Sequence, residues 1–186
     1  MSETAPPSAS YLRRLYLVRF AFAAAWAATF AGVGSSLSVA SVTLLILYPA
    51  FDAAAAAVDF HSSRDRVLYA NMAISTVAGI AVAIAAADDR AAVLRVWGAW
   101  AIVAGAVQLS LALRRRAFGG QWAMILSGGI SVLAGAAFVG QAGSASSMKQ
   151  LAGYAALGGV FFLVSAIRLQ RSAATGERVL ATTLEA

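Results

Sequence analysis

The chain has 186 residues, of which 61% are hydrophobic and 12% are charged, and its mean hydropathy is +0.77. A soluble domain needs many more polar side chains to cover its surface, so this composition excludes that class and indicates an integral membrane protein. The formal charge of +6 does not indicate nucleic acid binding, because the basic residues lie at the ends of apolar runs and not along one polar face.

The chain begins with a polar segment and continues with six long apolar runs. The segment MSETAPPSAS is rich in proline and serine, and we expect residues 1–11 to be disordered. A hydrocarbon core of roughly 30 Å needs about 20 apolar residues of helix. The predicted spans are 15–33, 37–58, 67–87, 91–113, 121–140 and 151–170. Residues 172–186 are expected to form a cytoplasmic tail outside a bundle that covers residues 12–171.

Only short polar or small-residue breaks, such as GVGSS and DDR, separate these runs. Breaks this short make neighbouring spans antiparallel. The alanine and glycine content favours helices, and no stretch shows the alternating pattern of a membrane strand. We therefore expect an all-α membrane protein built as a bundle of six transmembrane helices.

The basic residues are distributed unequally between the two sides of the membrane. With six spans both termini share one side, which collects Arg13, Arg14, Arg19, Arg64, Arg66, Arg114, Arg115, Arg116, Arg168, Arg171 and Arg178. The other side keeps only Arg90, Arg95 and Lys149. The positive-inside rule therefore predicts that both termini lie in the cytoplasm.

The first helix of each predicted hairpin repeats one pattern. RFAFAAAWA begins at Arg19, NMAISTVAG at Asn71 and SGGISVLAG at Ser127, and small residues follow at four-residue spacing. This spacing puts the small side chains on one helix face, which allows close helix approach in lipid. The predicted packing residues on these helices are Ala27, Gly79 and Gly135.

The second helix of each hairpin repeats as well. YPAFDA, WAIVAG and YAALGG each begin with an aromatic residue and have a small residue at the sixth position, where Gly105 and Gly159 are further packing residues. Both alignments give a spacing of 52 to 56 residues. The simplest account is three tandem antiparallel hairpins, about 12–62, 63–116 and 117–171, in a pseudo-threefold arrangement. The first run also fits a secretory signal, but its removal would break one repeat.

Two segments resemble a known family. RVWGAWAIVAGAVQLSLALRRR and WAMILSGGISVLAGAAF, the latter followed by LAGYAALGGVFFLVSAIRLQR, are similar to the HdeD-type membrane proteins, which are built from short tandem repeats. The resemblance covers the second and third hairpins, whereas the first departs from it at YPAFD. It implies a six-span protein of the bacterial inner membrane with a role in stress or acid tolerance. It implies no catalytic residues.

The first repeat alone has a charge on each of its two helices. Arg19 aligns with Asn71 and Ser127, and Asp52 aligns with Ala104 and Gly158, all of them uncharged. An isolated charge costs up to roughly 2.5–3.5 kcal/mol near the bilayer centre, so pairing relieves both residues. We therefore predict an ion pair between Arg19 and Asp52.

Pro49 lies one turn before Asp52 and leaves a backbone carbonyl without its helix hydrogen bond. Arg19, Asp52, Pro49 and Asn71 are therefore a candidate intramembrane polar site. A second interpretation stays open, in which the pair only fixes the helix register. Further polar residues that can line a seam between helices, or simply bond one helix to another, are Gln108, Ser75 and Thr76. The arginines of RRRAFGG are expected to face lipid headgroups.

Two functions follow from these features. The first is a non-enzymatic membrane protein of the HdeD type that acts in stress tolerance or as a membrane scaffold. The second is a small transporter or channel that uses Arg19 and Asp52. No Ser/His pair, metal-ligand cluster or paired carboxylates occur within the spans, so we expect no enzyme activity, no cofactor and no metal. The expected partners are the lipid bilayer and either a second copy or another membrane protein, but not nucleic acid.

Overall fold

The computed structural model describes residues 9–118, 121–144 and 147–184. Within these ranges the secondary structure is helical and no strand occurs. The helices are α1 (Ala9–Val33), α2 (Val39–Ser63), α3 (Val67–Ala85), α4 (Arg90–Arg114), α5 (Gln121–Gln141) and α6 (Gln150–Leu184), and the short 3-10 helix η1 (Arg116–Phe118) precedes α5.

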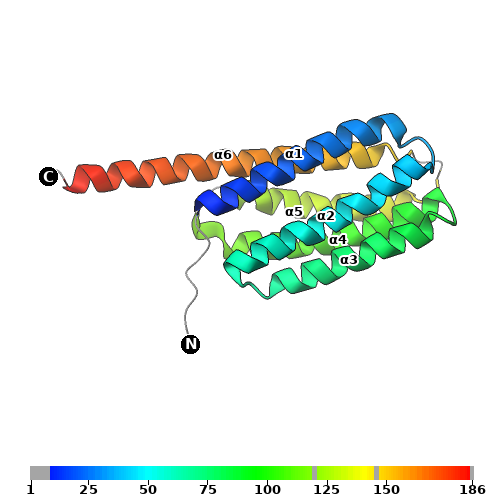
Figure 1. Cartoon of the computed structure of the whole chain (residues 1–186), viewed down its shortest axis with the longest axis horizontal. Coiled ribbons are helices and arrows are strands. Elements are labelled where there is room, and N and C mark those ends of the chain that lie inside the picture. Colours follow the sequence, from blue (N-terminus) through cyan, green and yellow to red (C-terminus); the bar gives the residue numbers. More distant parts are fainter. Residues whose placement is uncertain (1–8, 119–120, 145–146, 185–186) are drawn as a thin grey trace.

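The six predicted spans are confirmed as helices. In the part of the chain that the structure describes, six helices are long and apolar enough to cross a membrane. In the first hairpin, α1 begins at Ala9, before its predicted start, and α2 continues to Ser63, past its predicted end. Past Arg171, where the last candidate span ends, α6 continues to Leu184. Much of the segment expected as a tail therefore extends the last helix and projects from the bundle (Figure 1).

The early start of α1 has a packing cause. Leu12 is fully buried, and the Tyr11 hydroxyl donates a 2.6 Å hydrogen bond to the Val58 carbonyl of α2. These contacts stabilise the first turn, so the expected disorder is wrong for residues 9–11. The rest of that prediction concerns residues 1–8, which lie outside the described residues.

Short side-chain caps set the connections between the helices. The Ser38 hydroxyl accepts from the Ser41 amide at 3.2 Å and starts α2, and the Asp89 carboxylate accepts from the Ala92 amide at 2.7 Å and starts α4. Arg64 ends α2 in the left-handed region at φ 55°, which reverses the chain within a few residues.

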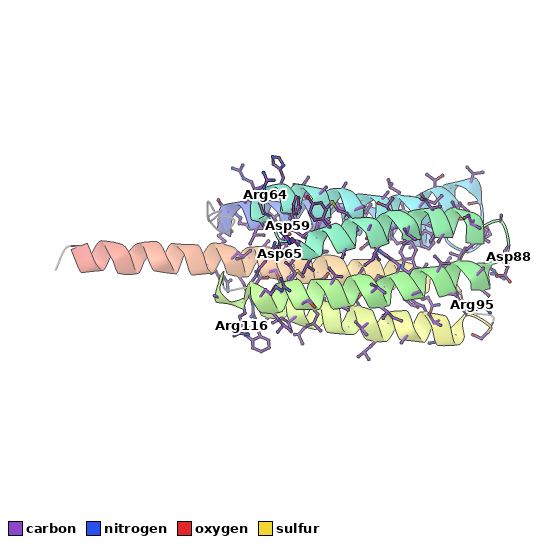
Figure 2. The ribbon with its side chains drawn as sticks, turned by 90° about the horizontal axis from the view of Figure 1, so that it is seen from below. Asp59, Arg64, Asp65, Asp88, Arg95 and Arg116 are labelled. Atoms are coloured by element: carbon purple, nitrogen blue, oxygen red, sulfur yellow. The ribbon has the colours of Figure 1, made fainter. Side chains whose placement is uncertain are left out.

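The six helices form a ring in chain order, and α6 closes the ring against α1. They run roughly along the long axis of the molecule (Figure 1). The α2–α3 and α4–α5 connections lie at the end where α1 begins, which we call the arginine-rich end. The α1–α2, α3–α4 and α5–α6 connections lie at the opposite end. Asp59, Arg64 and Arg116 mark the arginine-rich end, and Asp88 and Arg95 mark the opposite end (Figure 2).

The closest helix pair is α4–α5, and glycine makes this approach possible. A Cβ atom at Gly98 would lie 2.6 Å from the Gly135 carbonyl oxygen, and one at Gly105 would lie 2.8 Å from Cβ of Ser131. Both distances are shorter than van der Waals contact, so no larger residue fits without moving a helix. Gly105 and Gly135 thus lie at a helix contact, as their spacing predicts.

The other predicted packing residues lie in looser contacts. A Cβ atom at Gly159 of α6 would lie 3.2 Å from Cβ of Ala23 in α1. One at Gly79 of α3 would lie 3.8 Å from the Ile46 carbonyl oxygen of α2, which is ordinary contact distance. Ala27 is buried. Small residues therefore lie at the α4–α5, α1–α6 and α2–α3 contacts, but of these three only α4–α5 requires glycine.

The outer faces of the helices are apolar, as contact with hydrocarbon requires. Large side chains such as Val77, Ile84 and Leu133 are largely exposed on the protein surface. In water such exposure would form an adhesive patch, whereas in a bilayer it is the contact with lipid. Among the described residues, the exposed mid-helix hydroxyls of Thr29, Thr76 and Ser110 bond carbonyls of their own helices.

Candidate functional site

A cavity of about 100 Å³ lies inside the ring and is lined by residues from all six helices. Its volume suffices for several water molecules or a solute of a few heavy atoms. The polar residues of its wall are Tyr16, Arg19, Tyr48, Asp52, Asp59, Asn71, Gln108, Arg115, Ser127, Ser131 and Tyr154. A cavity with this many polar groups inside six apolar helices is the candidate functional site.

The Asp52 carboxylate accepts three hydrogen bonds at the centre of the site. Its Oδ1 atom accepts a hydrogen bond from Nη2 of Arg19, within an ion pair between α2 and α1. Its Oδ2 atom accepts from Nδ2 of Asn71 and from the Ser75 hydroxyl of α3, both at 2.8 Å. The carboxylate thus ties three helices together through three hydrogen bonds.

Two aromatic side chains extend this network. Nε1 of Trp100 donates to the Ser75 hydroxyl at 3.0 Å, so α4 orients the hydroxyl that bonds Asp52. The Arg19 guanidinium lies 5.0 Å from the ring centroid of Phe162 in α6, within cation–π distance. Arg19 is therefore held from one side by Asp52 and supported from another by an aromatic face.

A second ion pair lies at the arginine-rich end of the cavity. Nη1 and Nη2 of Arg115 donate to Oδ2 and Oδ1 of Asp59 at 2.7 and 2.9 Å, which is a bidentate pair. The two side chains are 7% and 5% exposed. Burial lowers the pKa of Arg115, but the hydrogen bonds and charge of Asp59 outweigh burial and leave that pKa above its ordinary value.

Contacts between non-adjacent helices surround the cavity at this end. Asp59 of α2 reaches Arg115 at the end of α4, and the Tyr16 hydroxyl of α1 donates to Oε1 of Gln121 in α5 at 3.3 Å. Because α2 and α4 are not neighbours in the ring, nor are α1 and α5, these contacts run across its interior. Three of the four side chains, Tyr16, Asp59 and Arg115, line the cavity.

Aromatic side chains fill the ring on the other side of the cavity. Trp26 of α1 stacks on Phe30 with ring centroids 4.6 Å apart, and it also packs against Trp97 and Tyr48. Trp97 and Phe30 are fully buried. The polar cavity thus lies between an aromatic cluster and a layer of ion-paired and hydrogen-bonded side chains.

No family model, curated protein or solved structure matches this chain. The described residues contain no group of three or more His, Cys, Asp or Glu that could hold a metal ion. The site is therefore interpreted from its own geometry.

The structure brings together three of the four predicted site residues. Arg19, Asp52 and Asn71 meet in one network, and Asn71 adds a bond that the repeat alignment did not anticipate. Pro49 is the exception. The helix α2 continues through this residue, which packs near Gly79 of α3 and does not line the cavity. The expected polar gap beside Asp52 is thus lined by side chains and not opened by the proline.

The expected polar seam is present in part. Ser75 bonds Asp52, and Gln108 lines the cavity and donates to the Met124 carbonyl at 3.2 Å. Thr76 instead lies on the exposed face of α3 and donates to the carbonyl of Met72, one turn earlier. A hydroxyl that bonds its own helix in this way adds nothing to the cavity.

The Asp59–Arg115 pair was missed by sequence reasoning, which assigned all three arginines of RRRAFGG to headgroups. That assignment is wrong for Arg115, because η1 follows immediately and the guanidinium turns into the ring. Asp59 had a usable signal: it follows Asp52 by seven residues, which places both carboxylates on one face of α2. Its partner Arg115 had no such signal, because three adjacent arginines differ only in the direction in which their side chains point.

Proposed function

We propose that the protein is a non-enzymatic, multi-pass membrane protein that binds a small polar solute in the axial cavity and carries it across the bilayer. Arg19 and Asp52 form the binding pair, and Asn71 and Ser75 hold Asp52 in position. The observation that supports this function is a cavity with the Arg19–Asp52 ion pair in its wall. Charged groups inside a membrane cost free energy and tend to mark solute or ion pathways.

A pseudo-threefold repeat is part of this proposal. The aligned triplets all line the cavity, namely Arg19, Asn71 and Ser127; Tyr48, Trp100 and Tyr154; and Asp52, Ala104 and Gly158. This common position supports an axis through the cavity, with the first repeat supplying the charges.

Equivalent hydrogen bonds in two hairpins support the same repeat. Nε1 of Trp100 donates to Ser75 in the second hairpin, and the hydroxyls of Tyr154 and Ser131 share a 2.6 Å hydrogen bond in the third. The first hairpin has Ala23 at the serine position, so Tyr48 has no such partner there. Asp52 supplies the polar group of that hairpin instead.

We also propose that the arginine-rich end faces the bacterial cytoplasm. The excess of arginine at that end supports this orientation through the positive-inside rule. The cavity then opens toward the cytoplasm when the Asp59–Arg115 and Tyr16–Gln121 contacts part, and the aromatic cluster closes the outer side.

A purely structural role in stress tolerance, as in HdeD-type proteins, is the second candidate function. It is favoured by one observation, namely that both carboxylates of the cavity wall are already paired, Asp52 by three donors and Asp59 by a bidentate arginine. Fully paired networks of this kind can serve helix register alone.

Uptake by proteoliposomes tests the choice between the two functions. The purified chain would be reconstituted and offered radiolabelled cationic, neutral and anionic solutes of a few heavy atoms. Transport predicts that one class accumulates and that Asp52→Ala abolishes uptake, whereas Asp65→Ala, at the edge of the bundle, does not. Absence of flux for every class, combined with a lower melting temperature of Asp52→Ala, would favour the structural role and refute transport.

A further inference from the structure

Hydrogen-bond donors remain available in the cavity wall. Asp52 accepts three hydrogen bonds and Asp59 accepts two from Arg115, so the strongest acceptors are engaged. A guanidinium has five N–H donors, and the described hydrogen bonds of Arg19 use one of them. The remaining donors of Arg19 lie in the cavity wall, where they suit the two oxygens of a carboxylate.

Charge balance limits what can bind to these donors. Arg19 and Asp52 together are neutral, and so are Asp59 and Arg115, so an anion alone would leave one negative charge inside the ring. Such an uncompensated charge is strongly disfavoured inside a bilayer. One proton on Asp52 restores neutrality, because Arg19 then pairs with the incoming anion.

We infer that the cavity binds a small monovalent carboxylate on Arg19 together with one proton on Asp52. This inference rests on the proposed function and names its solute. In the binding step the Arg19–Asp52 ion pair breaks, a proton from the bulk solution adds to Oδ1 of Asp52, and the solute carboxylate accepts hydrogen bonds from the N–H groups of Arg19. The net charge of the site is zero before and after, so proton and anion move together without net charge.

The surroundings of Asp52 identify it as the group that takes the proton. The titratable side chains that face it are Arg19 from α1, Tyr48 from α2 and Tyr154 from α6. The side chains of α3 and α4 in the Asp52 network are an amide, a hydroxyl and an indole. Asp59 of α2 and Arg115 at the end of α4 line the same cavity, and each is engaged by the other in an ion pair. The α5 wall contributes serines. Asn71 and Ser75 continue to donate to Oδ2, which leaves Oδ1 free for the proton once Arg19 turns away.

The walls of the cavity favour an organic anion of small size. Phe22 and Phe162 line it beside Arg19, and the volume of about 100 Å³ leaves room for only a few heavy atoms. An apolar tail of two or three carbons can contact these rings while the carboxylate binds Arg19. Propionate meets both requirements and is the probe chosen for the test.

Propionate binding to the purified full chain would be measured by calorimetry in detergent. The same titration in weak buffer with a pH indicator counts protons. We expect one proton taken up per propionate bound and an affinity that falls about tenfold for each unit by which the pH is raised. Propionamide, a neutral molecule of similar shape, should not bind. Binding without proton uptake, or equal binding of propionamide, would overturn the inference.

Variants separate the two charges. Asp52→Asn imitates the protonated carboxyl and should bind propionate with no proton uptake and with an affinity independent of pH. Arg19→Gln should lose propionate binding, while Arg114→Gln, outside the cavity, should retain it. Loss of binding in a folded Asp52→Asn would refute proton coupling, and the wild-type proton count decides the case if that variant does not fold. If another solute class binds through Asp52 and propionate does not, the inference fails but the proposed function stands; if none binds, both fail.

Discussion

Removing the charge of Arg115 is expected to destabilise the protein far more than removing the charge of its neighbour Arg114. Arg115 is 7% exposed and makes a bidentate pair with Asp59, which is 5% exposed. Breaking a buried pair by removing one partner costs about 3–5 kcal/mol, because the other charge stays buried without a partner. Arg114 is 62% exposed and lies 3.5 Å from Asp65, so its pair contributes about 0–1 kcal/mol.

The measurement is thermal unfolding in detergent, followed by the helical circular dichroism signal, for Arg115→Gln and for the matched control Arg114→Gln. On the scale of globular domains of this size, the larger loss corresponds to a fall in Tm of roughly 10 °C. The double variant Asp59→Asn with Arg115→Gln should recover most of the loss, since neither side chain is then charged. Equal Tm values for the two single variants, or additive effects in the double variant, would refute the argument.

The effect of pH on this pair follows from the direction of the Arg115 shift. The pKa of Arg115 is raised in the folded chain, because the hydrogen bonds and charge of Asp59 outweigh the opposing effect of burial. A raised pKa means that the stabilisation is complete below the ordinary arginine value and is lost only as pH rises through the folded value. The loss caused by Arg115→Gln should therefore be the same at pH 7 and at pH 9.

Three further predictions concern packing, orientation and the site network. Gly98→Ala should destabilise by about 1–3 kcal/mol, because its Cβ would lie 2.6 Å from a backbone oxygen of α5, whereas Gly129→Ala, which points into open space, should be neutral or slightly stabilising in the same melts. The chain has no cysteine, so His61→Cys and Asp88→Cys report the two ends, and the proposed orientation predicts that an impermeant maleimide labels intact cells only at position 88. Trp100→Phe removes a 3.0 Å hydrogen bond to a serine of α3 and should lower stability by about 1 kcal/mol in thermal melts.

The alignment of the three predicted hairpins located the charged pair of the site but not its neighbours. Aligning the hairpins isolated Arg19 and Asp52 as the places where one copy differs from the other two, and the cost of an isolated intramembrane charge then predicted their pairing. The alignment did not predict which neighbouring side chains would point toward this pair. Ser75 was thus only a seam candidate, although it donates directly to Asp52, and Pro49 was assigned to a niche that it does not line.

The helix ends show a similar limit. Apolar length located all six spans, because hydrocarbon thickness sets the number of residues that must be apolar. It did not locate the ends of α1 and α2, where Tyr11 and Asp59 form contacts with distant parts of the chain. Polar residues at a span boundary can face water or turn inward, and composition is the same in both cases.

The amino-acid sequence by itself determined that this protein is a six-helix membrane protein with most of its arginine at one end. The physical reason is that the length of each apolar run and the distribution of arginines depend only on the order of residues along the chain. Only the tertiary structure decided that the ring surrounds a polar cavity, that Arg115 points inward while Arg114 does not, and that the close approach of α4 and α5 requires glycine. These features depend on distances between residues far apart in the chain, which packing sets.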